Sequence, residues 1–233
     1  MPCETKTALL FDLDGTLVDS LDELDLCINL ALRKHSLPLI EKVDVARFIG
    51  KGTGVMVQRT LTHLLGKQQS GQYTAAVLQA YNDYLTQYAG TQTRLLPGVL
   101  PSLERLSQHY PMALVTNKPR AVTEPLLKRL HLQPFFKSIV AGDDTPHPKP
   151  APDMLWLAAN ELNAKYDSCV MIGDSMNDQQ AACNAGMQAC LLNTGYNEGM
   201  NLRVWAQEFA PNCPIYDNIE QLTQDLLACG SSL

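Results

Sequence analysis

From Leu95 onward, short apolar runs alternate with stretches in which apolar residues recur every three or four positions. The short runs are closed by turn residues and predict strands, while the longer stretches predict helices. The predicted strands cover residues 111–117, 138–143, 168–174 and 187–194, with a short one near Ile215. The predicted helices cover residues 98–108, about 120–130, 152–163, 176–185 and 218–228. This alternation indicates a parallel sheet with crossover helices.

Residues 21–90 carry only the helical pattern, and no strand interrupts them. One helix starts at Leu21, after the good N-cap residue Ser20. Two further helices are predicted in EKVDVARFIG (41–50) and GVMVQRTLTHLLG (54–66), each stopped by glycine, and a fourth carries a stripe of tyrosines. This segment is long enough to be a small all-helical domain.

One more strand is predicted by the apolar run TALLF at residues 7–11, which has no crossover helix of its own. It most simply joins the later sheet, so the helical segment is an insertion. We expect an α/β protein with a Rossmann-like parallel sheet core, residues 1–16 and 95–233, and an inserted all-helical cap domain, residues 17–94. Ligands of such sheets bind beyond the carboxyl ends of the strands.

Composition narrows the classes of partner. The net charge is −6 and no run of Lys or Arg occurs, so neither nucleic acid nor an anionic membrane is an expected partner. No signal peptide and no membrane-spanning apolar window is found. The seven cysteines form no C-x-x-C pair and fit reduced thiols. We expect a cytoplasmic protein, monomer or homodimer, that acts on a small molecule.

Two aspartates follow the first strand in the sequence FDLDGT (11–16). Side chains at positions i and i+2 of a strand point to the same side, so Asp12 and Asp14 are expected to lie together, roughly 6.6 Å apart. Two ionised carboxylates at that distance repel by about 2.5 kcal/mol at an effective dielectric constant near 20. A bound cation would offset this repulsion.

Other predicted strands also end in polar residues. The set comprises Thr116 and Asn117, then Lys149 in HPKPAPD, then Asp174, Ser175 and Asp178. Carboxylates with one ammonium and one hydroxyl suit a hard divalent cation together with a phosphate group. Taken singly, Asp178 could equally be a favourable acid in the first turn of a helix.

The motifs FDLDGT, VTNK, KP and IGDSMND occur in this order, with a helical insertion after the first, and resemble the haloacid dehalogenase-like hydrolases. FDLDGTLVDS, the helical cap and GYNEG (195–199) further resemble the phosphoglycolate-phosphatase-like branch of that family. The resemblance implies a phosphatase that requires Mg²⁺, forms an aspartyl-phosphate and hydrolyses a small phosphorylated metabolite. It makes 2-phosphoglycolate the first substrate to test.

The resemblance also implies roles for residues of the first motif. Asp12 would be the nucleophile that attacks phosphorus. Asp14 would protonate the leaving alcohol and activate the attacking water, and its backbone carbonyl would ligate the metal. Gly15 would belong to the substrate-binding positions. Dehalogenases of this family lack the second aspartate, and phosphonatase-like relatives have a small residue there, so both activities are disfavoured.

The later motifs complete the implied site. Thr116 and the amide of Asn117 would hold phosphate oxygens, and Lys149 would neutralise them and bridge to Asp12. Asp174 would bind Mg²⁺ directly, and Asp178 would steer it, in direct contact or through other ligands.

Alternatives remain open at this point. The substrate could be another sugar phosphate, a nucleotide or pyrophosphate, the enzyme could be a β-phosphoglucomutase-like phosphomutase, or the chain could be a catalytically silent binding protein. Within the cap, IGKGTGVM (49–56) lacks the spacing of a P-loop and predicts a glycine turn. We hypothesise that Lys51 of this turn, or Arg47 or Arg59, binds a carboxylate of the substrate.

Overall fold

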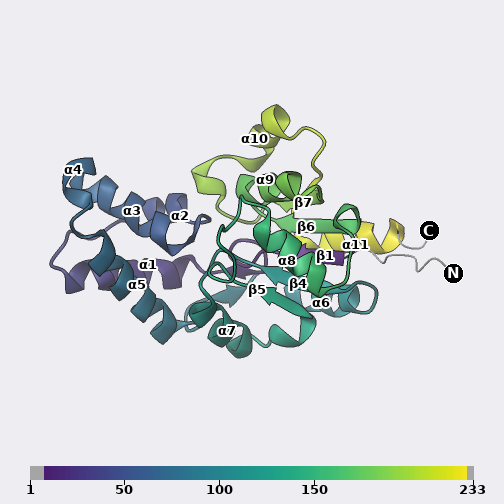
Figure 1. Ribbon diagram of the computed structural model, residues 1–233, viewed down its shortest axis with the longest axis horizontal. Helices are drawn as coiled ribbons and strands as arrows, with labels where there is room; N and C mark the ends of the chain where they lie inside the picture. Colours follow the sequence, from purple (N-terminus) through teal and green to yellow (C-terminus); the bar gives the residue numbers. More distant parts are fainter. Residues whose placement is uncertain (1–7, 230–233) are drawn as a thin grey trace.

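The computed structural model describes residues 8–229, and its centre is a parallel sheet of six strands (Figure 1). The strand order is β5-β4-β1-β6-β7-β8, and every neighbouring pair is parallel. The strands are β1 (Ala8–Phe11), β4 (Met112–Val115), β5 (Ser138–Val140), β6 (Cys169–Gly173), β7 (Gln188–Leu192) and β8 (Ile215–Tyr216). The predicted strands are confirmed, except that Thr7 lies outside the described residues. The predicted Rossmann-like sheet is therefore present.

The central strand β1 is buried on both faces because helices cover both sides of the sheet (Figure 1). Successive side chains of a strand point to opposite faces. Leu10 packs with α8 (Asp153–Glu161) and α9 (Met176–Ala185), whereas Leu9 and Phe11 pack into the larger core on the opposite face. The helices that contribute to this larger core include α6 (Val99–Ser107), α7 (Arg120–Arg129) and α11 (Ile219–Cys229).

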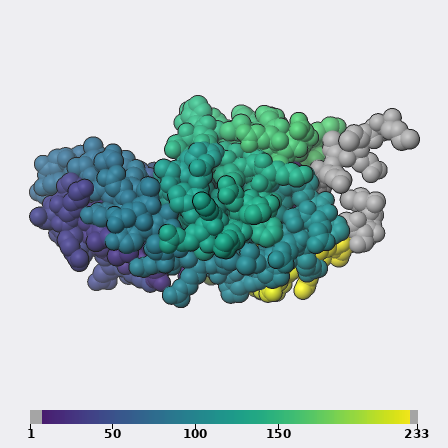
Figure 2. All heavy atoms as spheres, turned by 90° about the horizontal axis from the view of Figure 1, so that it is seen from below, coloured from purple at the N-terminus to yellow at the C-terminus, as the bar shows by residue number. Residues whose placement is uncertain are grey.

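The inserted helices gather at one end of the elongated molecule, drawn in purple and blue in Figures 1 and 2. They are α1 (Leu21–Lys34), α2 (Lys42–Phe48), α3 (Gly52–Leu65), α4 (Lys67–Ser70) and α5 (Thr74–Tyr88). Four were predicted, and the short α4 is an addition. From the predicted tyrosine stripe, Tyr81 is buried in the core, as the packing interpretation requires. The chain therefore has the predicted helical cap, and we keep residues 17–94 as its proposed bounds.

A short antiparallel ribbon lies where the chain passes between the two parts. It pairs β2 (Val18–Asp19) with β3 (Arg94–Leu95), in the register Val18 with Leu95. The sequence did not predict β2 and β3, because two residues are too few to show a strand periodicity. It also did not predict α10 (Leu202–Phe209), which packs its Trp205 over the end of the sheet. None of the described helices is both long and apolar enough to cross a membrane.

Candidate active site

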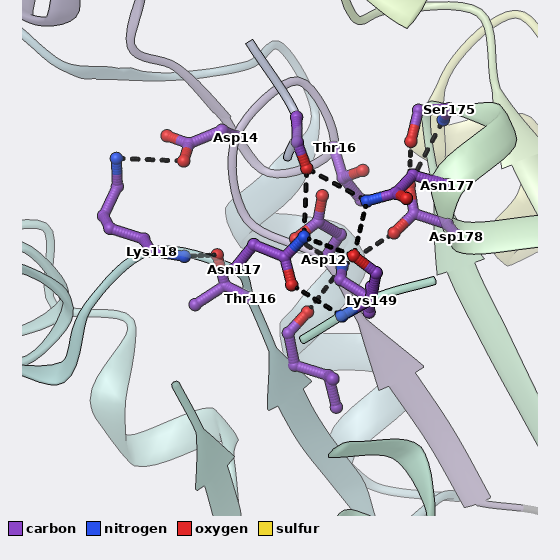
Figure 3. Close-up of polar contacts among 12 residues, drawn as sticks. Asp12, Asp14, Thr16, Thr116, Asn117, Lys118, Lys149, Ser175, Asn177 and Asp178 are labelled. Atoms are coloured by element: carbon purple, nitrogen blue, oxygen red, sulfur yellow. Dashed lines mark hydrogen bonds and ion pairs between the residues drawn. The ribbon is translucent and has the colours of Figure 1, made fainter. Parts of the chain in front are cut away.

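The polar residues predicted at the strand ends converge at the carboxyl-terminal edge of the sheet. Figure 3 shows Asp12, Asn117 and Lys149 of this group. Asp12 follows β1, Thr116 and Asn117 follow β4, and Asp174 follows β6. They meet because the carboxyl ends of parallel strands lie at the same edge. The loop before α8 supplies Lys149 to the same place.

Lys149 is the charged centre of this group. Its Nζ lies 2.9 Å from Asp12 Oδ1 and 2.7 Å from Asp178 Oδ1, and it donates to the carbonyl oxygen of Val115 at 2.8 Å. An ammonium has three N–H donors, so all of them are used. Burial alone would lower the pKa of Lys149, but Asp12 and Asp178 outweigh it and raise the pKa. Lys149 therefore stays charged.

The backbone of Lys149 is fixed by an amide side chain. Asn117 accepts from the Lys149 amide through Oδ1 at 2.9 Å and donates from Nδ2 to the Lys149 carbonyl oxygen at 2.9 Å. Asn177 Nδ2 donates to the same carbonyl oxygen at 3.2 Å. Both amide side chains also donate to the carbonyl oxygen of Gly50, at 3.1 and 3.0 Å, so the glycine turn of the cap contacts the strand ends. Sequence reasoning missed Asn177, although it lies within IGDSMND.

Asp12, Asp174 and Asp178 form a cluster in which one carboxylate oxygen from each lies within 4.8 Å of the others. Burial raises the pKa of Asp12 to about 7; Lys149 acts against this shift and Asp178 adds to it. Burial, Asp178 and Asp12 together raise the pKa of Asp174 well above its ordinary value. Full ionisation of the three carboxyls would therefore leave more negative charge than the single ammonium of Lys149 neutralises. Buried carboxylate oxygens with excess negative charge suit a hard divalent cation.

Asp174 is held in place from two sides. Thr16 Oγ1 donates to its Oδ1 at 3.0 Å, and the Tyr196 amide donates to its Oδ2 at 3.1 Å. A Cβ at Gly15 would lie 2.5 Å from Asp174 Oδ2, and one at Gly195 would also collide with this carboxylate. The structure thus places Gly15 against a member of the acidic cluster, and its predicted contact with substrate stays a prediction.

Asp178 has protein donors on both carboxylate oxygens. Ser175 donates to Oδ2 from its amide at 3.2 Å and from Oγ at 2.7 Å, in the capping box of α9, and Lys149 occupies Oδ1. Asp178 thus lies in the first turn of α9, as the alternative interpretation of this residue expects. Each of these oxygens keeps a further lone pair, and Asp178 belongs to the acidic cluster, so direct ligation of a cation and indirect support both stay predictions.

The carboxylate of Asp14 lies outside this cluster, and its part beside Asp12 in holding a cation stays a prediction. Strand β1 ends at Phe11, so the i, i+2 rule does not extend to Asp14. The chain turns instead, and Asp14 Oδ2 lies 2.9 Å from Lys118 Nζ (Figure 3). Ligation of the metal by the Asp14 backbone carbonyl remains a prediction.

Lys118 was assigned no role from the sequence, although it is the last residue of VTNK. A lysine directly after a strand end is the signal that could have identified it. Its side chain is buried, and it lines a cavity between the strand ends and the cap. The cavity is lined by Asp12, Asp14, Thr116, Asn117 and Lys118 on one side and by Leu24, Phe48, Ile49, Gly50, Gly52, Thr53, Met56 and Tyr81 of the cap.

Lys51 does not line this cavity. Its Nζ lies 2.7 Å from Glu198 Oε1, and Arg59 Nη2 lies 2.6 Å from the other oxygen of Glu198. Arg47 pairs with Asp44 at 2.9 Å. All three cap cations considered for a substrate carboxylate thus have protein partners.

The chain is also similar to known proteins. The family model of the haloacid dehalogenase-like hydrolases matches residues 9–192. The phosphoglycolate phosphatase of Yersinia pestis is 36% identical over 190 residues, which cover 81% of this chain and 82% of that protein. Phosphoglycolate phosphatase 1 of Pseudomonas aeruginosa is 34% identical over 228 residues, 95% of this chain and 79% of that protein.

Solved structures share the fold. The crystal structure of a predicted phosphoglycolate phosphatase from Haemophilus somnus 129pt superposes with a TM-score of 0.85 at 29% identity. The match covers 95% of this chain and 98% of that one.

Proposed function

Because this chain belongs to the haloacid dehalogenase-like hydrolases and is a phosphoric monoester hydrolase, we propose that it hydrolyses 2-phosphoglycolate through an aspartyl-phosphate on Asp12 with the help of Mg²⁺. The observation that carries the proposal is the position of Asp12. It belongs to the acidic cluster, contacts the ammonium of Lys149 and lines the cavity between the strand ends and the cap.

The reaction has two displacement steps. In the first, Asp12 attacks phosphorus, the bond from phosphorus to the leaving oxygen breaks, and Asp14 gives a proton to that oxygen. In the second, Asp14 takes a proton from water, the resulting hydroxide attacks phosphorus, and the bond to Asp12 breaks to release phosphate. The Lys149 ammonium orients the Asp12 carboxylate through their contact and offsets its negative charge.

Other residues of the cavity bind and orient the phosphate. The Thr116 hydroxyl and the Asn117 amide are proposed to donate to phosphate oxygens, and both residues line the cavity. Asp12, Asp174 and the Asp14 backbone carbonyl would hold Mg²⁺, with Asp178 steering it through Lys149 and Ser175. When bound, Mg²⁺ supplies positive charge that offsets the negative charge of the phosphate and its ligands.

The cap, residues 17–94 in our proposal, excludes water and selects the leaving group. Gly50 contacts Asn117 and Asn177, so the glycine turn closes directly over the strand ends. The relatives named phosphoglycolate phosphatase support a small substrate with a carboxylate.

The test is release of inorganic phosphate from 2-phosphoglycolate and from a panel of sugar phosphates, nucleotides and pyrophosphate, with Mg²⁺ or with EDTA. We expect the highest kcat/KM for 2-phosphoglycolate and loss of activity with EDTA and in Asp12→Asn. Asp153→Asn is the matched control, because Asp153 lies in the first turn of α8 and pairs with His147 instead of the acidic cluster. A panel on which no ester is hydrolysed would contradict the proposal.

A further inference from the structure

The ammonium of Lys118 is buried but only partly used. The residue is 5% exposed, and its Nζ contacts Asp14 Oδ2 at 2.9 Å (Figure 3). An ammonium carries three donors, so within residues 8–229 two N–H groups of Lys118 have no protein partner. Burying a charge costs free energy unless its hydrogen bonds are made, so this arrangement calls for another acceptor.

Lys149 shows what a fully used ammonium looks like in the same site. It is 3% exposed, and Asp12, Asp178 and the Val115 carbonyl oxygen occupy its three donors. Of these two buried lysines at the strand ends, Lys118 is therefore the one that can bind a further anion.

The partner of Lys118 is also incompletely satisfied. Asp14 Oδ1 is buried and has no hydrogen-bond partner in the described part of the chain. Both Asp14 and Lys118 line the cavity, together with Tyr81. The free donors of Lys118 and the free acceptor of Asp14 thus belong to residues that line the same cavity. This is the arrangement expected of a site that binds a polar ligand.

The cap side of the cavity offers no competing cation. The cap residues that line it are apolar or uncharged, among them Phe48, Ile49 and Met56. Lys51 and Arg59 are held by Glu198, outside the lining. Among the described residues that line the cavity, Lys118 is therefore the positively charged one that a negative group beyond the phosphate would meet.

We propose that Lys118 determines specificity among phosphate esters by binding the carboxylate of the leaving group. This inference rests on the proposed phosphatase function and deepens it. A single ammonium matches the single charge of a carboxylate, and charge-assisted hydrogen bonds are the strong ones. An ester with an uncharged leaving group leaves the two donors of Lys118 unpaired, which a buried site penalises.

The experiment compares two esters of similar size, 2-phosphoglycolate and ethyl phosphate, on the Mg²⁺-loaded protein. The variants are Lys118→Met and Lys118→Gln, both uncharged, with Lys51→Met as the control from the cap. The readout is the ratio of kcat/KM for the two esters. We expect either Lys118 variant to lower this ratio about 10- to 100-fold, mainly through KM for 2-phosphoglycolate, because one charge-assisted contact is lost. Lys51→Met should keep the ratio of the wild type.

Each outcome has a distinct meaning. Thermal melting first establishes that the variants are folded. Equal losses on both esters in folded Lys118 variants would show that Lys118 acts only through Asp14 and would overturn the inference. If the wild type prefers 2-phosphoglycolate and Lys118→Met keeps that preference, the proposed function stands but Lys118 does not determine specificity. A wild type that hydrolyses neither ester overturns the proposed function itself.

Discussion

Lys51 of the cap lies 2.7 Å from Glu198 of the sheet-bearing part, and this ion pair joins the two parts of the molecule. Arg59 adds a second cation to the same carboxylate at 2.6 Å. Burial would raise the pKa of Glu198, but Lys51 and Arg59 outweigh it and lower the pKa, so the carboxylate is charged at neutral pH. Glu198 belongs to GYNEG, whose Tyr196 donates its amide to Asp174. One loop therefore contacts both the cap and the acidic cluster.

We expect Glu198→Gln to loosen the closed cap. Partly exposed ion pairs contribute about 0.2–1 kcal/mol each, so kcat/KM should fall about two- to fivefold. Hydrogen exchange should become faster at amides of the glycine turn and unchanged at β1. Arg203→Gln is the control, since its pair with Asp217 is exposed and lies outside the cap. Unchanged exchange in the glycine turn would contradict the prediction.

Stability of the metal-free protein should fall as the pH rises from 5 to 8. The pKa of Asp12 is raised from 3.8 to about 7 in the folded state, chiefly by burial, so between these values the folded chain binds more protons than the unfolded chain. Stability then decreases with rising pH, and Asp174 acts in the same direction. Thermal melting at constant ionic strength measures this slope, which should become shallower in Asp12→Asn.

Added Mg²⁺ should reverse that loss, because a cation competes with protons for the same carboxylates. At pH 8, a Mg²⁺ concentration of about 100 times Kd should raise Tm by about 5–10 °C. At pH 5 the increase in Tm should be markedly smaller. Equal increases at both values would show that Mg²⁺ binds away from Asp12 and Asp174.

Removal of the Lys149 ammonium should destabilise the protein strongly. Lys149→Met leaves Asp12 and Asp178 without their shared cation, and breaking a buried ion pair from one side costs about 3–5 kcal/mol. Urea unfolding at pH 8 measures the loss, which should shrink at pH 5, where Asp12 is protonated. The exposed Lys137 provides the control Lys137→Met, for which we expect little change. A loss that is equal at the two pH values would point to packing instead of charge.

The strands and the residues at their ends could be predicted because both depend on local pattern. Apolar runs marked the strands, and parallel order alone brought Asp12, Thr116 and Asp174 to one edge. The orientation of Asp14 could not be predicted, because it depends on the turn that follows Phe11, where Gly15 has a φ of +87°. The roles of Lys51 and Lys118 also depend on tertiary contacts. Both lysines lie beside turns, so their local sequence does not distinguish them. The packing of the cap against the strand ends leaves Lys118, and not Lys51, in the cavity lining.

The close approach of Gly15 to Asp174 gives a test of how the acidic cluster is positioned. In Gly15→Ala the new Cβ would lie 2.5 Å from Asp174 Oδ2, at a backbone φ that L side chains rarely adopt. Asp174 has to move away from Thr16 Oγ1, and we expect the affinity for Mg²⁺ to fall at least about tenfold. The increase of Tm on Mg²⁺ titration measures this affinity.

Gly54→Ala is the matched control for this substitution. Gly54 lies within α3, and apart from its own helix backbone and its chain neighbours no atom lies within 4 Å of an added Cβ. Alanine should therefore leave Mg²⁺ affinity unchanged and stabilise the helix by about 0.5–1 kcal/mol. If Gly15→Ala instead keeps its affinity for Mg²⁺ and loses only affinity for phosphate, the added Cβ is accommodated beside Asp174. Gly15 then acts on the substrate, as the sequence resemblance implies, because its backbone would be the element that approaches the phosphate.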